Sequence, residues 1–160
     1  MVSMNNHCVL RKSLGLVYEV FWNIPAEWAN ANISRGISHV RYSTAGASTP
    51  VNAQPLMANM AGQLIGIAHN GTICNARSLR RELQDEGAIF QTTTDTELVL
   101  HMMARGLKRC KGDLWEALTE ALHRLRGAYS LLLMTKDQMV AVRDPSGFRP
   151  LSIVDYNEGC

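Results

Sequence analysis

The alternation of apolar and polar residues predicts strands toward both ends of the chain and helices in between. Runs rich in apolar and β-branched residues favour strands at 14–21, 36–44, 64–69, 129–135, 139–143 and 151–154. The dipeptide Asn70-Gly71 follows one of these runs and is typical of a tight turn. Lys136-Asp137 separates two neighbouring runs and predicts a hairpin. The stretch 45–54 is polar and is expected to be a loop.

Helical spacing appears in three places, each with its own start and stop signals. A first helix is predicted over 76–86, with Asn75 as N-cap and Gly87 as the stop. A second is predicted to begin at Thr94, because Thr94 and Glu97 have the spacing of a capping box. The third repeats that device and ends at Gly127, with its signals at Asp113 and Glu116 and its apolar stripe at Leu114, Leu118, Leu122 and Leu125. Pro25 is expected to open a short helical turn before Trp28.

This order of elements predicts an α+β fold in which helices lie on mostly antiparallel sheets. A regular alternation of strand and helix, which would indicate a parallel sheet, is not found. The length of 160 residues suits one domain with a sizeable core. Four methionines, Met60, Met102, Met103 and Met134, are expected to fill that core.

Composition and charge exclude several classes of protein. The formal net charge of +2 is too small to indicate a nucleic-acid partner. No run approaches the roughly 18 apolar residues of a membrane span, and the first residues contain no apolar leader. The four cysteines, Cys8, Cys74, Cys110 and Cys160, form no closely spaced metal or redox pair. A cytoplasmic protein is therefore expected.

Three polar segments at the ends of predicted elements carry groups that suit a free amino acid. Arg41 offers a planar guanidinium for a carboxylate, and the hydroxyl of Thr44 can contact the same oxygens. Asp95, at the start of a predicted helix, is an anion suited to an ammonium group. Asn70 and Gly71 supply an amide side chain and a backbone N–H, the donors that an oxyanion hole needs.

Each of these residues also has a simpler interpretation. An isolated arginine is usually a surface ion pair, Asn70-Gly71 is usually a hairpin turn, and an aspartate at a helix start usually serves the helix alone. His39 and His69 are expected to be hydrogen-bonded ends of strands and not metal ligands, because the sequence supplies no further ligands near them.

Six segments taken together resemble one family. They are HVRYSTAG, NAQP, AHNG, NAxxLRRELxxEGAIFQTTTDTE, LRGAYSLLLMT and AVRDPSGFRPLSI, in this order between about Val9 and Val154. They are similar to the glutaminase domain of the amidophosphoribosyltransferases, which are class II glutamine amidotransferases. The resemblance implies the αββα sandwich of the N-terminal nucleophile hydrolases, here incomplete, and a glutaminase that supplies ammonia to phosphoribosyl pyrophosphate in purine synthesis, giving 5-phosphoribosylamine.

The resemblance also implies roles for individual residues. Arg41 and Thr44 would bind the α-carboxylate of glutamine, Asp95 its α-ammonium, and Asn70 with Gly71 would form the oxyanion hole. No cofactor is implied in this region, since the Mg²⁺ of the full-length enzymes and the iron–sulfur cluster of some members are bound elsewhere. The implied partners are glutamine, a phosphoribosyltransferase domain and further copies of the full-length chain, without nucleic acid or membrane.

The sequence departs from the family pattern at both ends. The family nucleophile is an N-terminal cysteine, and Cys8 does not match it, because its neighbours resemble a later family segment. The phosphoribosyltransferase motif is also absent from the 160 residues. The chain alone is therefore expected to bind glutamine poorly and not to hydrolyse it. A non-catalytic amino-acid-binding module and a sibling amidotransferase with another acceptor are the alternative interpretations.

Overall fold

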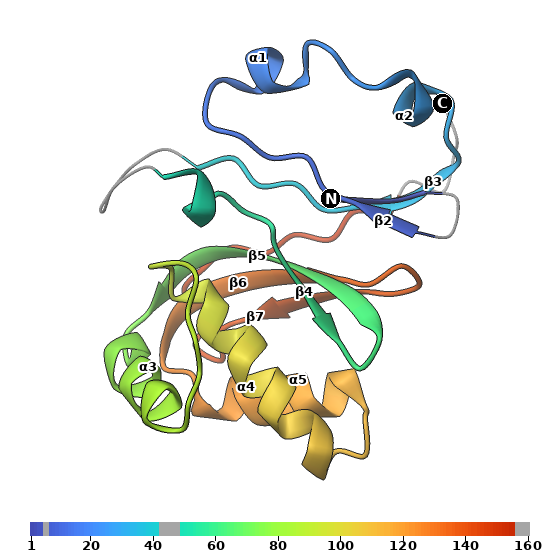
Figure 1. The fold of residues 1–160 in the computed structure, drawn as a ribbon. Helices are drawn as coiled ribbons and strands as arrows, with labels where there is room; N and C mark the ends of the chain where they lie inside the picture. The colour runs from blue at the N-terminus through green and yellow to red at the C-terminus, as the bar shows by residue number, and fades with distance from the viewer. Residues whose placement is uncertain (5–6, 42–48, 156–160) are drawn as a thin grey trace.

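The computed structural model describes residues 1–4, 7–41 and 49–155, which form two stacked antiparallel sheets with helices (Figure 1). The smaller sheet has the order β2-β1-β3 and the larger one β4-β5-β6-β7. The strands are β1 (Val2–Met4), β2 (His7–Val9), β3 (Ile33–Gly36), β4 (Leu56–Met60), β5 (Gln63–Ile73), β6 (Gly127–Met134) and β7 (Met139–Arg143). The α+β class predicted from the order of elements is confirmed.

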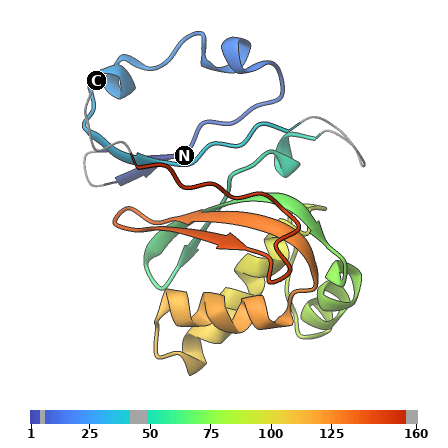
Figure 2. The same ribbon diagram turned by 180° about the vertical axis from the view of Figure 1, so that it is seen from behind.

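The helices are distributed unequally between the two sheets. One face of the four-stranded sheet is covered by α3 (Ala76–Asp85), α4 (Thr96–Arg109) and α5 (Leu114–Arg124), and its other face lies toward the three-stranded sheet (Figures 1 and 2). Only the short helices α1 (Val17–Phe21) and α2 (Ala26–Ala29) accompany the three-stranded sheet. A 3₁₀ turn at Pro50–Asn52 precedes β4.

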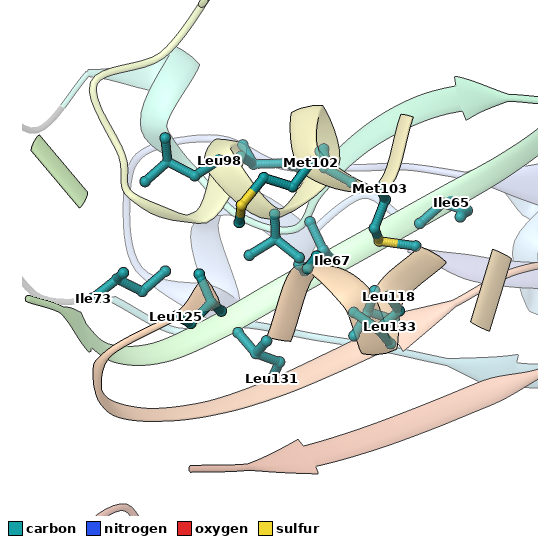
Figure 3. Close-up of a cluster of buried hydrophobic side chains, with 14 of the residues drawn as sticks. Ile65, Ile67, Ile73, Leu98, Met102, Met103, Leu118, Leu125, Leu131 and Leu133 are labelled. Carbon is teal, nitrogen blue, oxygen red and sulfur yellow. The ribbon is translucent and has the colours of Figure 1, made fainter. Parts of the chain in front are cut away.

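The main core lies between the four-stranded sheet and its helices (Figure 3). Strands β5 and β6 contribute Ile65, Ile67, Leu131 and Leu133, which face Met103 and the other apolar residues of α4 and α5. A smaller cluster of Met1, Ile37, Ala68 and Met134 joins the two sheets. All four methionines predicted to be core residues are buried.

The helices and the last hairpin agree best with the sequence predictions. Helix α3 has the expected position, with Leu79 and Leu83 buried and Gly87 at a positive φ just beyond its end. Helix α5 begins as predicted, because the carboxylate of Asp113 accepts hydrogen bonds from the N–H groups of Trp115 and Glu116. Strands β6 and β7 pair across the predicted turn. The helical turn after Pro25 is also present as α2.

The prediction of a strand at 14–21 is wrong, because this segment contains α1. Most of its large apolar side chains are exposed, among them Leu16, Val17 and Tyr18. A strand needs a neighbouring strand for its backbone groups, whereas a helix pairs these groups internally. The helix begins where the N–H of Leu16 donates to the carboxylate of Glu19 over 2.8 Å.

The boundaries of other predicted strands also change. The ladder of β3 ends at Gly36, where the sequence predicted a strand to begin. Ile37 still exchanges two backbone hydrogen bonds with Met1, and residues 38–41 have no assigned secondary structure. The last part of this predicted strand, 42–44, and the first part of the predicted loop, 45–48, lie outside the described residues. Strand β4 was not predicted at all. Residues 151–154 form no strand, and Ile153 and Val154 there are exposed.

The Asn70-Gly71 dipeptide is not a turn, because β5 continues through it to Ile73. Strand β6 pairs with β5 along this whole stretch, and Gly71 lies opposite Tyr129. The tertiary partner therefore overrides the local turn preference.

Three predicted helix ends are wrong in detail. Helix α4 begins at Thr96, with Asp95 at the N-cap position, and not at Thr94. Asn75 occupies the N-cap position of α3, but its side chain makes no capping hydrogen bond to that helix. The side chain instead bonds the backbone of Arg124 and Arg126. Gly127 starts β6, since α5 has already ended at Arg124.

Candidate functional site

The second half of β5 forms the edge of the four-stranded sheet, because β4 pairs only as far as Ile67. Opposite Gly71, the N–H and the carbonyl of Tyr129 are both engaged with Asp144, at 3.2 and 2.8 Å. In an antiparallel pair a residue directs its N–H and its carbonyl to the same side. The register therefore turns the N–H of Gly71 away from β6 and toward the open edge.

The N–H groups of His69 and Ile73 point to the same edge as that of Gly71. The N–H of His69 donates to Oε1 of Gln54 over 2.7 Å, and the N–H of Ile73 donates to Oδ2 of Asp95 over 2.9 Å. The N–H of Gly71 lies between these two bonds in the strand. Gly71 has a φ of +146°, and a Cβ there would overlap the carbonyl oxygen of Ala128. Glycine is therefore required at this position.

Asp95 is held at this edge by two donors. Besides the bond from Ile73, its Oδ1 lies 3.2 Å from Nδ1 of His69, and the side chain is 25% exposed. Burial raises the pKa of Asp95, but the hydrogen bond and the electrostatic attraction of His69, with the N–H groups of Ile73 and of Asp95 itself, outweigh burial and lower the net pKa. Asp95 is thus a fixed carboxylate with a solvent-facing side.

The loop before Asp95 is fixed by a buried glutamate. The carboxylate of Glu97 accepts from the N–H groups of Gln91 and Thr92 at 2.9 and 2.8 Å, and from the Thr92 hydroxyl at 2.7 Å. Asn52 adds two bonds to Thr93, at 2.8 and 3.1 Å. Burial raises the pKa of Glu97, but these donors and His101 more than offset it and lower the net pKa. The loop therefore presents Asp95 from a rigid support.

Arg41 lies on the extended segment that follows β3 and is exposed. It lines a cavity of about 330 Å³ together with His39, Gln54 and two further cations, Arg11 and Lys12. The described lining contains no acidic residue. Burial lowers the pKa of His39, and the neighbouring charge of Arg41 lowers it further. Such a cavity favours an anionic group.

Two histidines link the segment that carries Arg41 to the side chain of Asp95. Nε2 of His39 lies 3.1 Å from the carbonyl oxygen of His69, whose side chain contacts Asp95. Asn70 is exposed in β5. Asn70, Gly71 and Asp95 are not among the described residues that line the cavity of Arg41. Thr44 lies outside the described residues.

Two described cysteines, Cys8 and Cys110, do not have the environment of an activated thiol. Burial raises the pKa of Cys8, and the negative charge of Asp137 raises it further. Burial also raises the pKa of Cys110, which lies in the core. Cys74 is exposed just after β5. A nucleophilic thiol requires a lowered pKa, so the rejection of Cys8 from its sequence context agrees with its surroundings.

The sequence reasoning missed three residues that support this site. Gln54, Asn52 and Glu97 each hold a backbone group of β5 or of the loop before Asp95. The signal was available, because Asn52 and Gln54 belong to the NAQP segment and Glu97 to TTTDTE. His39 and His69 are hydrogen-bonded as predicted, but neither ends a strand, because His39 lies beyond β3 and His69 lies within β5. Nε2 of His69 has no partner among the described residues.

Features of two other protein classes are absent from the described part of the chain. No three histidine, cysteine or acidic side chains there come together as a metal site. No described helix combines the length and the apolar character needed to cross a bilayer. The cytoplasmic location stays a prediction.

Comparison with known proteins identifies the family. Residues 39–159 match the model of the glutamine amidotransferase domain. The amidophosphoribosyltransferase of Lacticaseibacillus casei is 42% identical over 142 residues, which cover 88% of this chain and 70% of that protein. The Methanocaldococcus jannaschii amidophosphoribosyltransferase is 44% identical, over 89% of this chain and 30% of that protein.

A solved structure described as the allosteric regulatory enzyme of purine biosynthesis has a TM-score of 0.71 and 37% identity, covering 85% of this chain and 28% of that one. The chain spans about a quarter of the length of the first plant relatives, such as chloroplastic amidophosphoribosyltransferase 2 of Arabidopsis thaliana, to which it is 44% identical over 86% of its length. The matched domain and the extent of these similarities show that the chain belongs to the glutamine amidotransferase domain family, among the amidophosphoribosyltransferases.

Proposed function

We propose that this chain is the glutamine-binding part of an amidophosphoribosyltransferase. The observation that carries the proposal is the edge of β5, where the N–H of Gly71 is directed outward beside the fixed carboxylate of Asp95. The N–H of Gly71 can donate to developing negative charge, and the carboxylate of Asp95 can accept from a cation. Both groups lie along the same short stretch of β5. That combination suits an amino acid whose side chain undergoes acyl transfer.

In this proposal the two charged groups of glutamine are held by residues of opposite charge. The α-ammonium lies against Asp95, whose lowered pKa keeps it ionised at neutral pH. The α-carboxylate lies against Arg41, in a cavity also lined by Arg11 and Lys12. Thr44 adds a hydroxyl to the same carboxylate.

The reaction we propose takes place at the side-chain amide of glutamine. A thiolate attacks the amide carbon, and the carbonyl oxygen becomes an oxyanion that the side-chain N–H of Asn70 and the backbone N–H of Gly71 stabilise. As this intermediate collapses, the C–N bond breaks and the proton removed from the thiol passes to the departing nitrogen. Ammonia is released and a thioester remains, which water hydrolyses to glutamate and the free thiol. Burial raises the pKa of both Cys8 and Cys110, which disfavours either as the source of this thiolate. We expect the 160 residues alone to release no ammonia from glutamine.

The names of the relatives support a proposal for the acceptor of the ammonia. Their name describes transfer of an amino group to a phosphoribosyl compound, and we propose phosphoribosyl pyrophosphate as the acceptor and 5-phosphoribosylamine as the product. The acceptor domain would be a phosphoribosyltransferase domain outside the residues described, and the full-length protein would self-associate.

Calorimetric titration of the chain with L-glutamine tests the proposed roles. We expect Asp95→Asn and Arg41→Met each to weaken binding at least about tenfold, which corresponds to about 1.4 kcal/mol. Asp113→Asn and Arg77→Met are matched controls, because they make the same changes at exposed sites on α5 and α3, and they should leave the affinity unchanged. Equal affinity in all four variants would contradict the proposal.

A further inference from the structure

His69 is buried at the centre of the site, although none of the proposed chemical steps uses its ring. Its side chain is 2% exposed, and Nδ1 lies 3.2 Å from Oδ1 of Asp95 and 3.1 Å from Oγ1 of Thr96. Its backbone is fixed as well, because its N–H donates to Gln54 and its carbonyl lies 3.1 Å from Nε2 of His39. The ring therefore has a single, well-defined position.

The contact with Asp95 determines which nitrogen carries the proton. A lone pair on Nδ1 would repel a carboxylate oxygen at 3.2 Å, whereas an N–H there is attracted to it. Thr96 accepts a bond from Nε2 of Gln54 over 3.3 Å, so its hydroxyl is held beside the same N–H. Nδ1 is accordingly the donor of the pair.

The other ring nitrogen of His69, Nε2, makes no hydrogen bond within the described structure. Nε2 is buried and has no hydrogen-bond partner among the described residues. An unpaired buried polar atom destabilises a fold, and an apolar side chain of similar size would not have this cost. A histidine at this position is therefore explained by Nδ1 alone and by what Nδ1 contacts.

Nδ1 completes a pair of donors that fix the carboxylate of Asp95. The N–H of Ile73 bonds Oδ2 and the N–H of His69 faces Oδ1, so these two residues contact different oxygens of the carboxylate. Two donors on different oxygens fix the plane of the carboxylate and leave lone pairs on the exposed side for a ligand. Without His69, one oxygen would lose its donor and the side chain could rotate.

We propose that His69 is a positioning residue, which orients the carboxylate of Asp95 toward the α-ammonium of the bound amino acid. This inference rests on the proposed binding of glutamine. In this proposal His69 does not contact the ligand. It makes the site selective for ligands with an α-ammonium group because it orients Asp95.

Two substitutions of His69 separate positioning from a structural role. His69→Leu removes the donor to Asp95, which costs stability, and also the unpaired Nε2, which offsets part of that cost, so the variant should still fold. We expect it to bind L-glutamine at least tenfold more weakly. His69→Asn places an amide N–H near the position of Nδ1 and should restore most of the affinity, because Nε2 makes no bond that asparagine would need to replace.

A ligand without the ammonium group is the matched control. Glutaramate keeps the amide and the carboxylate of glutamine but lacks the α-ammonium. Its affinity should be the same for the parent and for His69→Leu. An equal loss for glutaramate and L-glutamine would show that the variant disturbs the whole site and would overturn the proposal.

Titration of the Asp95 carboxyl carbon by NMR tests the contact without any ligand. The pKa of Asp95 should be higher in His69→Leu than in the parent, since the donor that lowers it is gone. If the parent binds no glutamine but this pKa rises, the proposed function fails while the hold of His69 on Asp95 stands. An unchanged pKa, or His69→Asn binding as weakly as His69→Leu, would overturn the positioning role.

Discussion

The four-stranded sheet with its helices and the three-stranded sheet with α1 and α2 differ in how much of their apolar surface is covered. The first buries a continuous core in which Ile67 and Leu131 are fully inaccessible. The second leaves Trp22, Tyr18 and Val40 mostly exposed and shares only a small cluster with its neighbour. A sheet covered by amphipathic helices is stable by itself, whereas a sheet without such a layer depends on its contacts with the first.

The difference also explains where the site lies. Asp95, His69 and Gly71 belong to the well-packed region, and Arg41 belongs to the segment that leaves the three-stranded sheet. The residue proposed for the ammonium group thus belongs to a rigid scaffold, and the residue proposed for the carboxylate belongs to the less densely packed part of the chain. The following substitutions test this contrast, from the largest expected effect to the smallest.

Truncation of a core residue should have the largest effect. We expect Leu131→Ala to lower the free energy of unfolding by about 3 kcal/mol, because Leu131 is completely buried between β6 and the helices. Trp22→Ala removes a larger side chain that is 86% exposed and should change it by less than about 0.5 kcal/mol. Urea denaturation measures both. Comparable losses would show that the two regions are equally well packed.

Substitution of Gly71 should cause the second-largest loss in the free energy of unfolding. Gly71→Ala places a Cβ against the carbonyl oxygen of Ala128 at a φ of +146°, and we expect a loss of at least about 2 kcal/mol. Gly62→Ala is the matched control, because Gly62 also has a positive φ but nothing lies within 4 Å of its Cβ position. Its loss should be about 1 kcal/mol. A reversed order in thermal unfolding would contradict the close approach of β5 and β6.

Acid should destabilise the four-stranded region through Glu97. Its pKa in the folded protein is lower than in the unfolded chain, so its contribution is present above the usual glutamate pKa and is lost as the pH falls through the lowered value. We expect Glu97→Gln to cost about 1.5 kcal/mol at pH 7 and less at pH 3. Urea midpoints at both pH values measure this. A cost independent of pH would mean that the charge of Glu97 contributes nothing.

Helix caps should give the smallest effect and the clearest regional contrast. Asp113→Ala removes the acceptor for two N–H groups of α5 and should lower global stability by about 1 kcal/mol. Glu19→Ala removes the acceptor for Leu16 at the start of α1, where we expect faster local hydrogen exchange and no change in global unfolding. A global loss from Glu19→Ala would show that α1 unfolds together with the main core.

Local signals were sufficient to place α3 and the start of α5 in the well-packed region. Leu79, Leu83 and Gly87 predicted α3 almost to the residue, and Asp113 predicted the start of α5. They failed for α1, because a short apolar run with β-branched residues is equally typical of a strand. The local pattern does not reveal whether a neighbouring strand is available to pair with it. Of the residues proposed for the site, the sequence alone identified Asp95, Arg41, Asn70, Gly71 and Thr44, and the roles of these residues remain proposals.

The sequence by itself determined the α+β class, the family and the chemical types of the site residues, since these depend on periodicity and on short motifs. The tertiary structure decided where those residues lie and which partners they contact. Only the pairing of β5 with β6 turned Asn70-Gly71 from a turn into an exposed strand edge. Only the packing of α4 against that edge brought Nδ1 of His69 to Asp95, across 26 residues of sequence. The physical reason is that hydrogen-bond partners distant in sequence are selected by register and packing, which no local pattern records.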